Sequence, residues 1–569
     1  MSEESAVDNE LRINNGLKPT FTWVLLAFAI GLSLRLVLLG AMTYTQNELV
    51  LVNRALQISQ RVSTATSTVP VYSGLTGLLF FLFGPSNFLG RVLPALVGAS
   101  LLLLPWLWKE QLGQKAALIL CFALALDPTY LVFSRAIHGG IFAIAGLLWT
   151  LTLIKNDRPL LAGVSLTIAF LSGPSFWSFL LIFGLILAIS KVINPELGKA
   201  LFPFQFRNGK KDWIRLAAGF VVSAFLIMTS FLLQPSGMGG AASGLVSFFE
   251  NFAQPFDRPI YHTIYLLLAH SLLPLIIFLI GFFKSRSSEM GDWHRIAAVS
   301  ILGSLLIGFL ISRDSFEVLL LPVLLCWIGG VAWLGKWQFK LAESNLSVVL
   351  LMGFVLAILT YLSVNFTRIS QLPLGTPQFW NIFLMIAAGI ILLVSAWWLV
   401  KFGWSIGNGN QVFLLTFLIF LAIVSMGSTT RSMNIDQQIR SLEYVDNQLI
   451  LPNNDVDAIL EDFSRTGKTL QQWGGFSLLD LPEEYSWYFR GFAIERNQPG
   501  SSMMLTRTTS MPTQSDEFRG KNVVLERTID WHREPLTTYL KAFSGKTKPF
   551  IDQKGVLWVR TFLFTGASQ

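Results

Sequence analysis

The chain has 569 residues, of which 53% are hydrophobic and 13% are charged, and its mean hydropathy is +0.56. This composition excludes a disordered protein and an ordinary soluble domain, and it is typical of a multi-pass membrane protein. The net charge of +8 arises largely from cationic loops between apolar segments, so it indicates membrane orientation and argues against nucleic-acid binding.

Apolar runs long enough to cross roughly 30 Å of hydrocarbon recur along most of the chain. After a polar tail over residues 1–20, they predict an all-α polytopic domain over 21–427 with about thirteen transmembrane helices. The expected spans lie near residues 21–42, 88–108, 115–133, 137–154, 159–173, 175–192, 213–233, 261–284, 295–312, 315–335, 346–365, 378–400 and 410–427.

Lysine and arginine are distributed unevenly between alternate loops. With a cytoplasmic N-terminus, the cytoplasmic segments, which include Lys109, Lys155 and Lys336, hold about threefold more cations than the outer loops before residue 428. Because cationic short loops are retained in the cytoplasm, this bias predicts a plasma-membrane protein with its N-terminus inside. An odd number of spans then places the C-terminal domain outside.

The first outer loop, residues 43–87, is long and partly apolar. It predicts a helix over 47–58, a Ser/Thr-rich link, and a second apolar segment over 71–83. The second segment is too short for a comfortable span, so we expect an interfacial or re-entrant helix. Such helices usually line a cavity, because lipid cannot satisfy the polar groups at their ends.

From residue 428 onward, charged and polar residues alternate with short apolar stretches. The runs 522–529 and 555–564 have the alternation of strands, whereas 455–463 has helical spacing. Residues 428–569 are therefore predicted to form an extracytoplasmic α+β domain. Both cysteines fall within apolar spans, so neither a disulfide framework nor a cysteine metal site is indicated.

Ionisable residues are scarce on the predicted outer side, and Glu48 is the first of them. It lies at the start of the predicted helix 47–58, beside an apolar loop that is expected to face a cavity, which suits general-base catalysis. The structural alternative is a first-turn carboxylate that interacts favourably with the helix dipole. Position alone leaves both roles open.

Asp127 lies near the outer end of the third predicted span, where an intramembrane acid indicates function. Its structural alternative is a helix break before Pro128 and an ion pair with Arg135. Arg135 itself is a candidate to bind a lipid phosphate through its guanidinium fork, and the alternative is snorkelling to the interface. His138 is more typical of a structural hydrogen-bonding residue than of a ligand.

The start of the tenth predicted span carries Arg313, Asp314 and Glu317. Arg313 and Glu317 are four residues apart, which favours an ion pair on one helical face. In the functional alternative, Arg313 completes a cationic site for a phosphate and the two acids orient it. Further candidates for contacts to an acceptor or between outer loops are Asn47, Arg54, His138, Asp257, Arg258 and His262.

Two segments carry a resemblance to a known family. After the first span come VPVYSGLTGLLFFLFGPSNFLGRVLPALVG (69–98) and KAALILCFALALDPTYLVFSRAIHGG (115–140), and this order resembles the integral-membrane glycosyltransferases of the GT-C fold. Within that family the chain is similar to the protein mannosyltransferase and aminoarabinose transferase branch. Residues 485–492 and 556–564 of the tail are similar to its flippase-activity-associated, dolichyl-phosphate-mannose mannosyltransferase-like subgroup.

The resemblance implies a glycosyltransferase that moves a sugar from a polyprenyl-phosphate-linked donor to an acceptor glycan, lipid or protein on the outer face. Our leading hypothesis makes Glu48 the base, with Asp127 as a further catalytic candidate although relatives often have serine there. Arg135, which matches an arginine of the family, and Arg313 are the expected ligands of the donor phosphate. A divalent metal is left open, and no other cofactor is indicated. The expected partners are the lipid bilayer, the lipid-linked sugar and the acceptor, without nucleic acid.

Two positions depart from the pattern of the family. Its first-loop Asp-Glu pair falls on Asn47 and Glu48, and an asparagine cannot accept a proton. Glu48 need not substitute, because one position along a helix turns the side chain by about 100°. An acid that many relatives carry after Ser-Arg is also replaced, by His138 and Gly139. The alternative function is therefore a catalytically inactive GT-C-like protein that binds a lipid or a partner complex.

Overall fold

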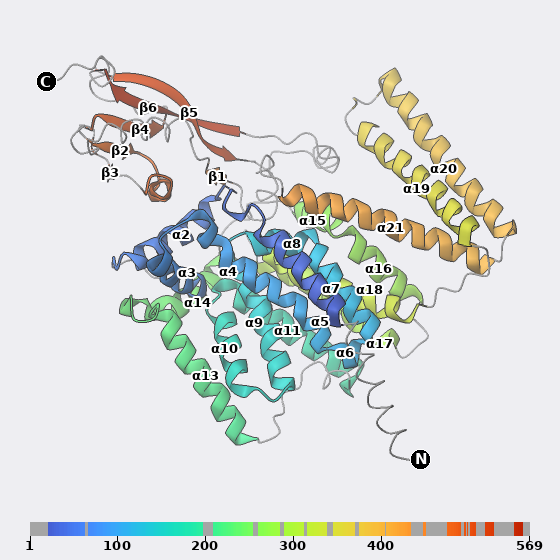
Figure 1. Ribbon diagram of the computed structural model, residues 1–569, viewed down its shortest axis with the longest axis horizontal. Coiled ribbons are helices and arrows are strands. Elements are labelled where there is room, and N and C mark those ends of the chain that lie inside the picture. Colours follow the sequence, from blue (N-terminus) through green and yellow to red (C-terminus); the bar gives the residue numbers. More distant parts are fainter. Residues whose placement is uncertain are drawn as a thin grey trace.

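A helical bundle with a small β-sheet at one end makes up the protein (Figure 1). The computed structural model describes residues 21–41, 43–62, 67–196, 209–253, 260–284, 290–311, 316–337, 345–369, 372, 375–403, 406–433, 448–450, 475–490, 494–496, 498, 501–507, 518–528 and 551–561.

Helices dominate the chain before residue 434, as the hydropathy pattern predicts. The apolar span Phe21–Ala41 comes first. The helices that follow are α2 (Gln46–Ser59), α3 (Pro70–Phe83), α4 (Asn87–Ser100), α5 (Leu104–Leu107), α6 (Lys109–Leu112), α7 (Gln114–Leu126), α8 (Pro128–Arg135), α9 (Gly139–Lys155), α10 (Pro159–Phe170), α11 (Pro174–Ile193), α13 (Lys210–Met228), α14 (Gly240–Ala253), α15 (Ile260–His270), α16 (Leu272–Lys284), α17 (Met290–Ile311), α18 (Leu320–Lys336), α19 (Asn345–Ile369), α20 (Pro377–Gly403) and α21 (Ile406–Met433).

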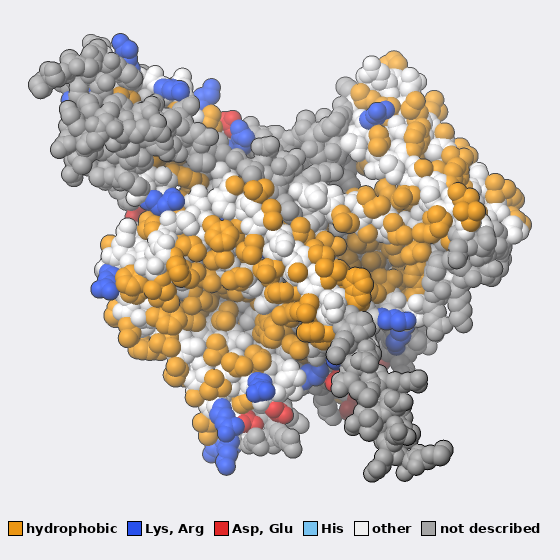
Figure 2. Space-filling model, viewed as in Figure 1, with side chains coloured by type: hydrophobic (Ala, Val, Ile, Leu, Met, Phe, Trp, Pro, Cys, Tyr) orange, Lys and Arg blue, Asp and Glu red, His pale blue; other side chains and the backbone are white. Residues whose placement is uncertain are grey.

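Seven of the described helices are long and apolar enough to cross a membrane, and the number rises to 9 if each of two bent pairs is one span. Apolar side chains cover the visible flank of the bundle, and basic side chains lie mainly at its edges (Figure 2). The multi-pass membrane class is therefore confirmed. The larger total of about thirteen spans stays a prediction, because several apolar helices are shorter than a bilayer requires.

A bend of 55° separates α7 from α8 within the third predicted span. Pro128 occupies the first turn of α8, where its missing N–H costs nothing, and the Asp127 carboxylate caps the helix by accepting from the Tyr130 amide at 3.0 Å. The second carboxylate oxygen accepts from the Trp327 indole at 2.8 Å. The predicted helix break is confirmed, but the expected ion pair with Arg135 is wrong because Tyr130 and Trp327 take its place.

The two helices predicted between residues 43 and 87 are confirmed as α2 and α3, which pack against each other and against the bundle. Pro70 begins α3 at a position that tolerates proline, and Gly84 ends it with φ of +81°. Their depth relative to a bilayer stays a prediction. In Figure 1 they lie at the end of the bundle that faces the sheet.

The six strands of the C-terminal region form one mixed sheet in the order β1-β5-β6-β4-β2-β3. β2 pairs in parallel with β3 and β4, and the other pairs are antiparallel. The predicted strands appear as β5 and β6, whereas the helix expected over 455–463 lies outside the described residues. The strands are β1 (Gln448–Ile450), β2 (Phe476–Leu479), β3 (Ile494–Arg496), β4 (Met503–Arg507), β5 (Phe518–Thr528) and β6 (Ile551–Arg560).

Small residues let α10 and α13 approach each other closely. A Cβ atom added to Gly163 would lie 2.2 Å from the Leu216 carbonyl oxygen, and one added to Gly219 would lie 2.4 Å from the Leu160 carbonyl oxygen. Both obstacles are backbone atoms, so a side chain at either position cannot be accommodated by a rotamer change. Close backbone approach through glycine is a usual mode of helix packing in membranes.

We expect Gly163→Val to force these helices apart and to lower the free energy of unfolding by about 1–3 kcal/mol. Thermal unfolding of the detergent-solubilised protein measures the effect. Gly184→Val in α11 is the matched control, because an added Cβ there meets no heavy atom within 4 Å. Equal unfolding temperatures for the two variants would contradict this account of the packing.

Candidate functional site

Glu48 lies in the first turn of α2, where the local sequence builds a capping box. The Thr45 hydroxyl accepts from the Glu48 amide at 3.3 Å, and Glu48 Oε2 accepts from the Thr45 amide at 2.9 Å. These reciprocal bonds satisfy two backbone donors at the start of the helix. The structural alternative raised by the sequence, a carboxylate that stabilises the first helical turn, is therefore present.

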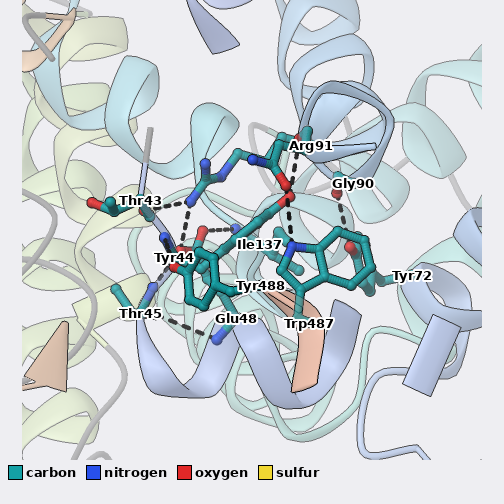
Figure 3. A network of polar contacts seen from close by, with 11 residues as sticks. Thr43, Tyr44, Thr45, Glu48, Tyr72, Gly90, Arg91, Ile137, Trp487 and Tyr488 are labelled. Atoms are coloured by element: carbon teal, nitrogen blue, oxygen red, sulfur yellow. Dashed lines mark hydrogen bonds and ion pairs between the residues drawn. The ribbon is translucent and has the colours of Figure 1, made fainter. Parts of the chain in front are cut away.

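The same carboxylate forms a buried ion pair with Arg91 of α4. Arg91 Nη2 lies 2.9 Å from Glu48 Oε2, and the side chains are only 1% and 2% exposed. Arg91 also donates to the Thr43 carbonyl at 2.7 Å, and the Ile137 amide donates to Glu48 Oε1 at 2.9 Å. Glu48 thereby joins α2, α4 and the turn between α8 and α9 (Figure 3).

An aromatic cluster covers this ion pair on the side of the C-terminal domain. The Arg91 guanidinium lies 4.0 Å from the centre of the Tyr44 ring, and Tyr44 meets Trp487 edge-on at 5.9 Å. Trp487 is fully buried and donates to the Asn87 side chain at 3.1 Å. The Tyr488 hydroxyl accepts from the Tyr44 amide at 3.3 Å, so this segment of the C-terminal domain docks directly on the Glu48 network (Figure 3).

Burial also controls the ionisation of the cluster. It raises the pKa of Tyr44 to about 12 and raises the pKa of Tyr488 above its ordinary value. A phenol is protonated at neutral pH even at its ordinary pKa of about 10, and burial extends this state to more alkaline solution. Tyr44 can then donate to the Asn87 carbonyl, at 3.0 Å.

A second polar cluster begins one residue beyond Ile137. His138 Nδ1 lies 2.7 Å from Glu317 Oε1, and the Ser175 hydroxyl donates to Glu317 Oε2. Glu317 belongs to a 3-10 turn, Phe316–Leu319, that leads into α18, so the cluster joins the starts of α9, α11 and α18. The His138 and Glu317 side chains are 12% and 6% exposed, which makes this cluster more accessible than Glu48.

The predicted phosphate ligand Arg135 is fully buried at the end of the first span. Its Nη1 donates to the carbonyls of Leu34, Arg35 and Val37 at 2.7, 3.2 and 2.8 Å. These carbonyls lie in and just after the last helical turn, where they lack intrahelical partners, so Arg135 stabilises the end of that helix. Its role in phosphate binding stays a prediction.

The other sequence candidates are dispersed. Asn47 is exposed, whereas its neighbour Glu48 is buried, as the turn of about 100° per residue requires. Arg54 lines a hollow of about 20 Å³ and donates to Gln57 at 3.2 Å. His262 is buried beside Tyr265. The remaining candidates lie outside the described residues, and they are Asp257, Arg258, Arg313 and Asp314.

Several members of the two clusters could not be predicted from the sequence. Arg91, Ser175 and Trp487 carry no motif, and they reach the site from distant parts of the chain. The unusual signal for Arg91 is a cation inside an apolar segment, because such a residue needs a buried partner. Among the described residues no group of three or more His, Cys, Asp or Glu side chains could hold a metal ion.

Comparisons with known proteins identify the fold. No protein-family model and no curated protein matches this chain. The crystal structure of ArnT from Cupriavidus metallidurans bound to undecaprenyl phosphate is similar with a TM-score of 0.54, 12% identity, and coverage of 94% of this chain and 98% of that one. The crystal structure of the same protein in the apo state is similar with a TM-score of 0.52, 13% identity, and coverage of 95% of this chain and 98% of that one. This chain therefore has the GT-C fold, whereas its place in a subgroup stays a prediction.

We expect Arg91→Met to leave the Glu48 carboxylate buried without its cation and to lower the free energy of unfolding by about 3–5 kcal/mol. Unfolding of the purified protein in detergent, followed by thermal or denaturant titration, measures the loss. The double variant with Glu48→Gln should recover part of it, because the uncompensated charge is gone.

Arg295→Met provides the control for the loss of an arginine. Arg295 pairs with Asp292 on one helix at 3.5 Å, and their side chains are 56% and 33% exposed, so its removal should cost less than about 1 kcal/mol. Equal stability of the Arg91 and Arg295 variants would contradict a structural role for the buried pair.

Proposed function

We propose that this protein is a membrane glycosyltransferase that transfers a sugar from a polyprenyl-phosphate-linked donor to an acceptor on the outer face of the membrane. The observation that carries the proposal is the GT-C fold over 94% of the chain, shared with an ArnT structure that holds undecaprenyl phosphate. The sequence resemblance of residues 69–98 and 115–140 to the same family supports it independently of the fold.

Glu317 is the best-placed candidate for the general base. It is a carboxylate near the end of the bundle that carries α2, its side chain is 6% exposed against 2% for Glu48, and His138 and Ser175 fix its orientation. In the proposed step Glu317 accepts the proton of the acceptor hydroxyl while that oxygen bonds to the anomeric carbon. The bond from that carbon to the lipid phosphate breaks, and the phosphate leaves with the bonding electron pair.

Glu48 has a positioning role in this proposal. Using Glu48 as a base would require breaking its buried ion pair with Arg91, whereas the partners of Glu317 are a histidine and a serine. Through the Ile137 amide it holds the turn that presents His138. Arg313, only four residues before Glu317, remains the proposed ligand of the donor phosphate, together with Arg135 as the sequence predicts.

Glu317→Gln should reduce sugar transfer by about 10²–10⁴-fold, because an amide cannot accept the proton. The measurement is transfer from a panel of polyprenyl-phosphate-linked sugars by the purified protein, with initial rates compared at saturating donor. Glu250→Gln removes an exposed carboxylate on α14 and should leave the rate unchanged. A wild-type rate for Glu317→Gln would overturn its assignment as the base.

A catalytically inactive GT-C-like protein is the second candidate, and the residue at position 47 favours it. Asn47 is exposed at the position of the family's first acid, so the carboxylate expected at the reacting centre is replaced by an amide. In this reading the protein keeps the fold and binds a lipid or partner without transferring a sugar.

Asn47→Asp tests this second candidate. If the protein is an inactive relative, the variant should gain transfer activity over a wild-type background indistinguishable from buffer, measured with the same donor panel. If the wild type is active and depends on Glu317, the substitution should change its rate by less than about tenfold. Activity in the wild type that survives both Glu317→Gln and Asn47→Ala would contradict both site assignments.

A further inference from the structure

An apolar cavity of about 250 Å³ lies inside the bundle, between α5, α7, α9, α11, α17 and α18. Its walls are mostly aliphatic and aromatic side chains. On α18 they include Leu321, Leu325, Ile328, Ala332 and Lys336, which recur every three or four residues and so form one stripe. At 1.5 Å per residue, this stripe is about 22 Å long, so the cavity is long and narrow.

One end of the cavity is polar and basic. Lys336, the only charged residue among those described in the walls, and Gln111 are both exposed at this end. Lys155 donates to the Gln111 amide oxygen at 2.7 Å and lies 4.8 Å from the centre of the Trp108 ring. The Trp108 indole donates to Thr152 at 2.8 Å. Since Lys155 occupies the amide oxygen of Gln111, the group that Gln111 can offer to a phosphate is its N–H donor.

This end has the composition of a membrane interface. Trp333 stacks on Trp337 at 5.3 Å, and the Lys284 ammonium lies 5.5 Å from the centre of the Trp333 ring. Tryptophan and lysine concentrate at the level of lipid headgroups. Glu110 acts electrostatically on Lys155, so the end is not purely cationic, but Lys336 stands in the cavity wall itself.

The walls and the basic end together define the chemistry of an occupant. Protein interiors leave few voids larger than a water molecule, and an apolar cavity of this size does not retain water. A hydrocarbon chain can make apolar contacts with the walls, and an anionic phosphate can accept hydrogen bonds from the lysine ammonium and from amide donors.

We propose that the cavity binds an anionic phospholipid, with one hydrocarbon chain along α18 and the phosphate at Lys336 and Gln111. The site is separate from the cluster of His138 and Glu317. α9 begins at Gly139, next to His138, and ends at Lys155, so about 25 Å of helix separates that cluster from the basic end. By the charge bias of the loops, the headgroup belongs to the cytoplasmic leaflet.

Native mass spectrometry of the full chain in detergent tests the proposal, with phosphatidylglycerol and phosphatidylcholine titrated separately. We expect one phosphatidylglycerol to be retained at least about tenfold more tightly than phosphatidylcholine, and to raise the unfolding temperature. Lys336→Gln should remove most of this preference by deleting the ammonium. Ala332→Trp should weaken binding of both lipids by filling the cavity.

Two matched controls separate the site from general effects. Lys401→Gln removes a lysine that lies 5.1 Å from the centre of the Trp397 ring but lies outside the cavity walls, and Ala388→Trp adds an indole to an exposed face of α20. Both should bind phosphatidylglycerol as the wild type does. Circular dichroism and gel filtration confirm that each variant is folded, and none of these readouts depends on sugar transfer.

Three outcomes would overturn the proposal. Equal retention of phosphatidylglycerol and phosphatidylcholine would remove the role of the anionic group. Unchanged binding by both Lys336→Gln and Ala332→Trp would place the lipid elsewhere. Displacement of the bound lipid by an equal concentration of glycerol 3-phosphate would show that the phosphate alone suffices and that the apolar cavity contributes nothing.

Discussion

The buried ion pair between Glu48 and Arg91 is the interaction on which the organisation of the end of the bundle that carries α2 depends. Two opposite charges in an apolar interior are tolerated only when both are paired and hydrogen-bonded, and here the carboxylate accepts from two backbone amides in addition to the guanidinium. Those bonds tie together three segments that are distant in the sequence. Any movement of α2 relative to α4 would leave a charge unpaired, so the arrangement resists displacement.

Several features of the candidate site follow from this constraint. Because Glu48 points inward, the neighbouring Asn47 points outward, and the two positions cannot exchange roles without rotating α2. Because Ile137 is held by Glu48, His138 is presented to Glu317 on the opposite side of the same turn. The C-terminal domain also contacts this network, since Trp487 and Tyr488 pack on Tyr44 beside the Arg91 guanidinium.

The two ends of the bundle differ in chemistry, and α9 and α18 connect them. Their starts carry the His138 and Glu317 cluster, and their ends carry Lys155 and Lys336 beside the apolar cavity. Polar groups at the end that carries His138 and Glu317 are engaged mostly with one another, whereas the walls of the cavity are almost wholly apolar. A shift of α18 relative to α9 would therefore alter the contacts at both ends, because side chains from both helices contribute to each end.

Hydropathy and charge by themselves determined the membrane class, the helices α2 and α3, the helix break at Pro128 and two strands of the sheet, because these depend on local composition and on backbone rules. The capping role of Glu48 was also open to sequence reasoning, since Thr45 stands three residues before it. What only the tertiary structure decided is which ionisable groups meet. Arg91, Ser175 and Trp327 lie far along the chain from Glu48, Glu317 and Asp127, and no periodicity encodes a pairing at such separations. Burial makes these pairings necessary, because an ionised or polar group inside the bundle destabilises the fold unless it is paired or hydrogen-bonded.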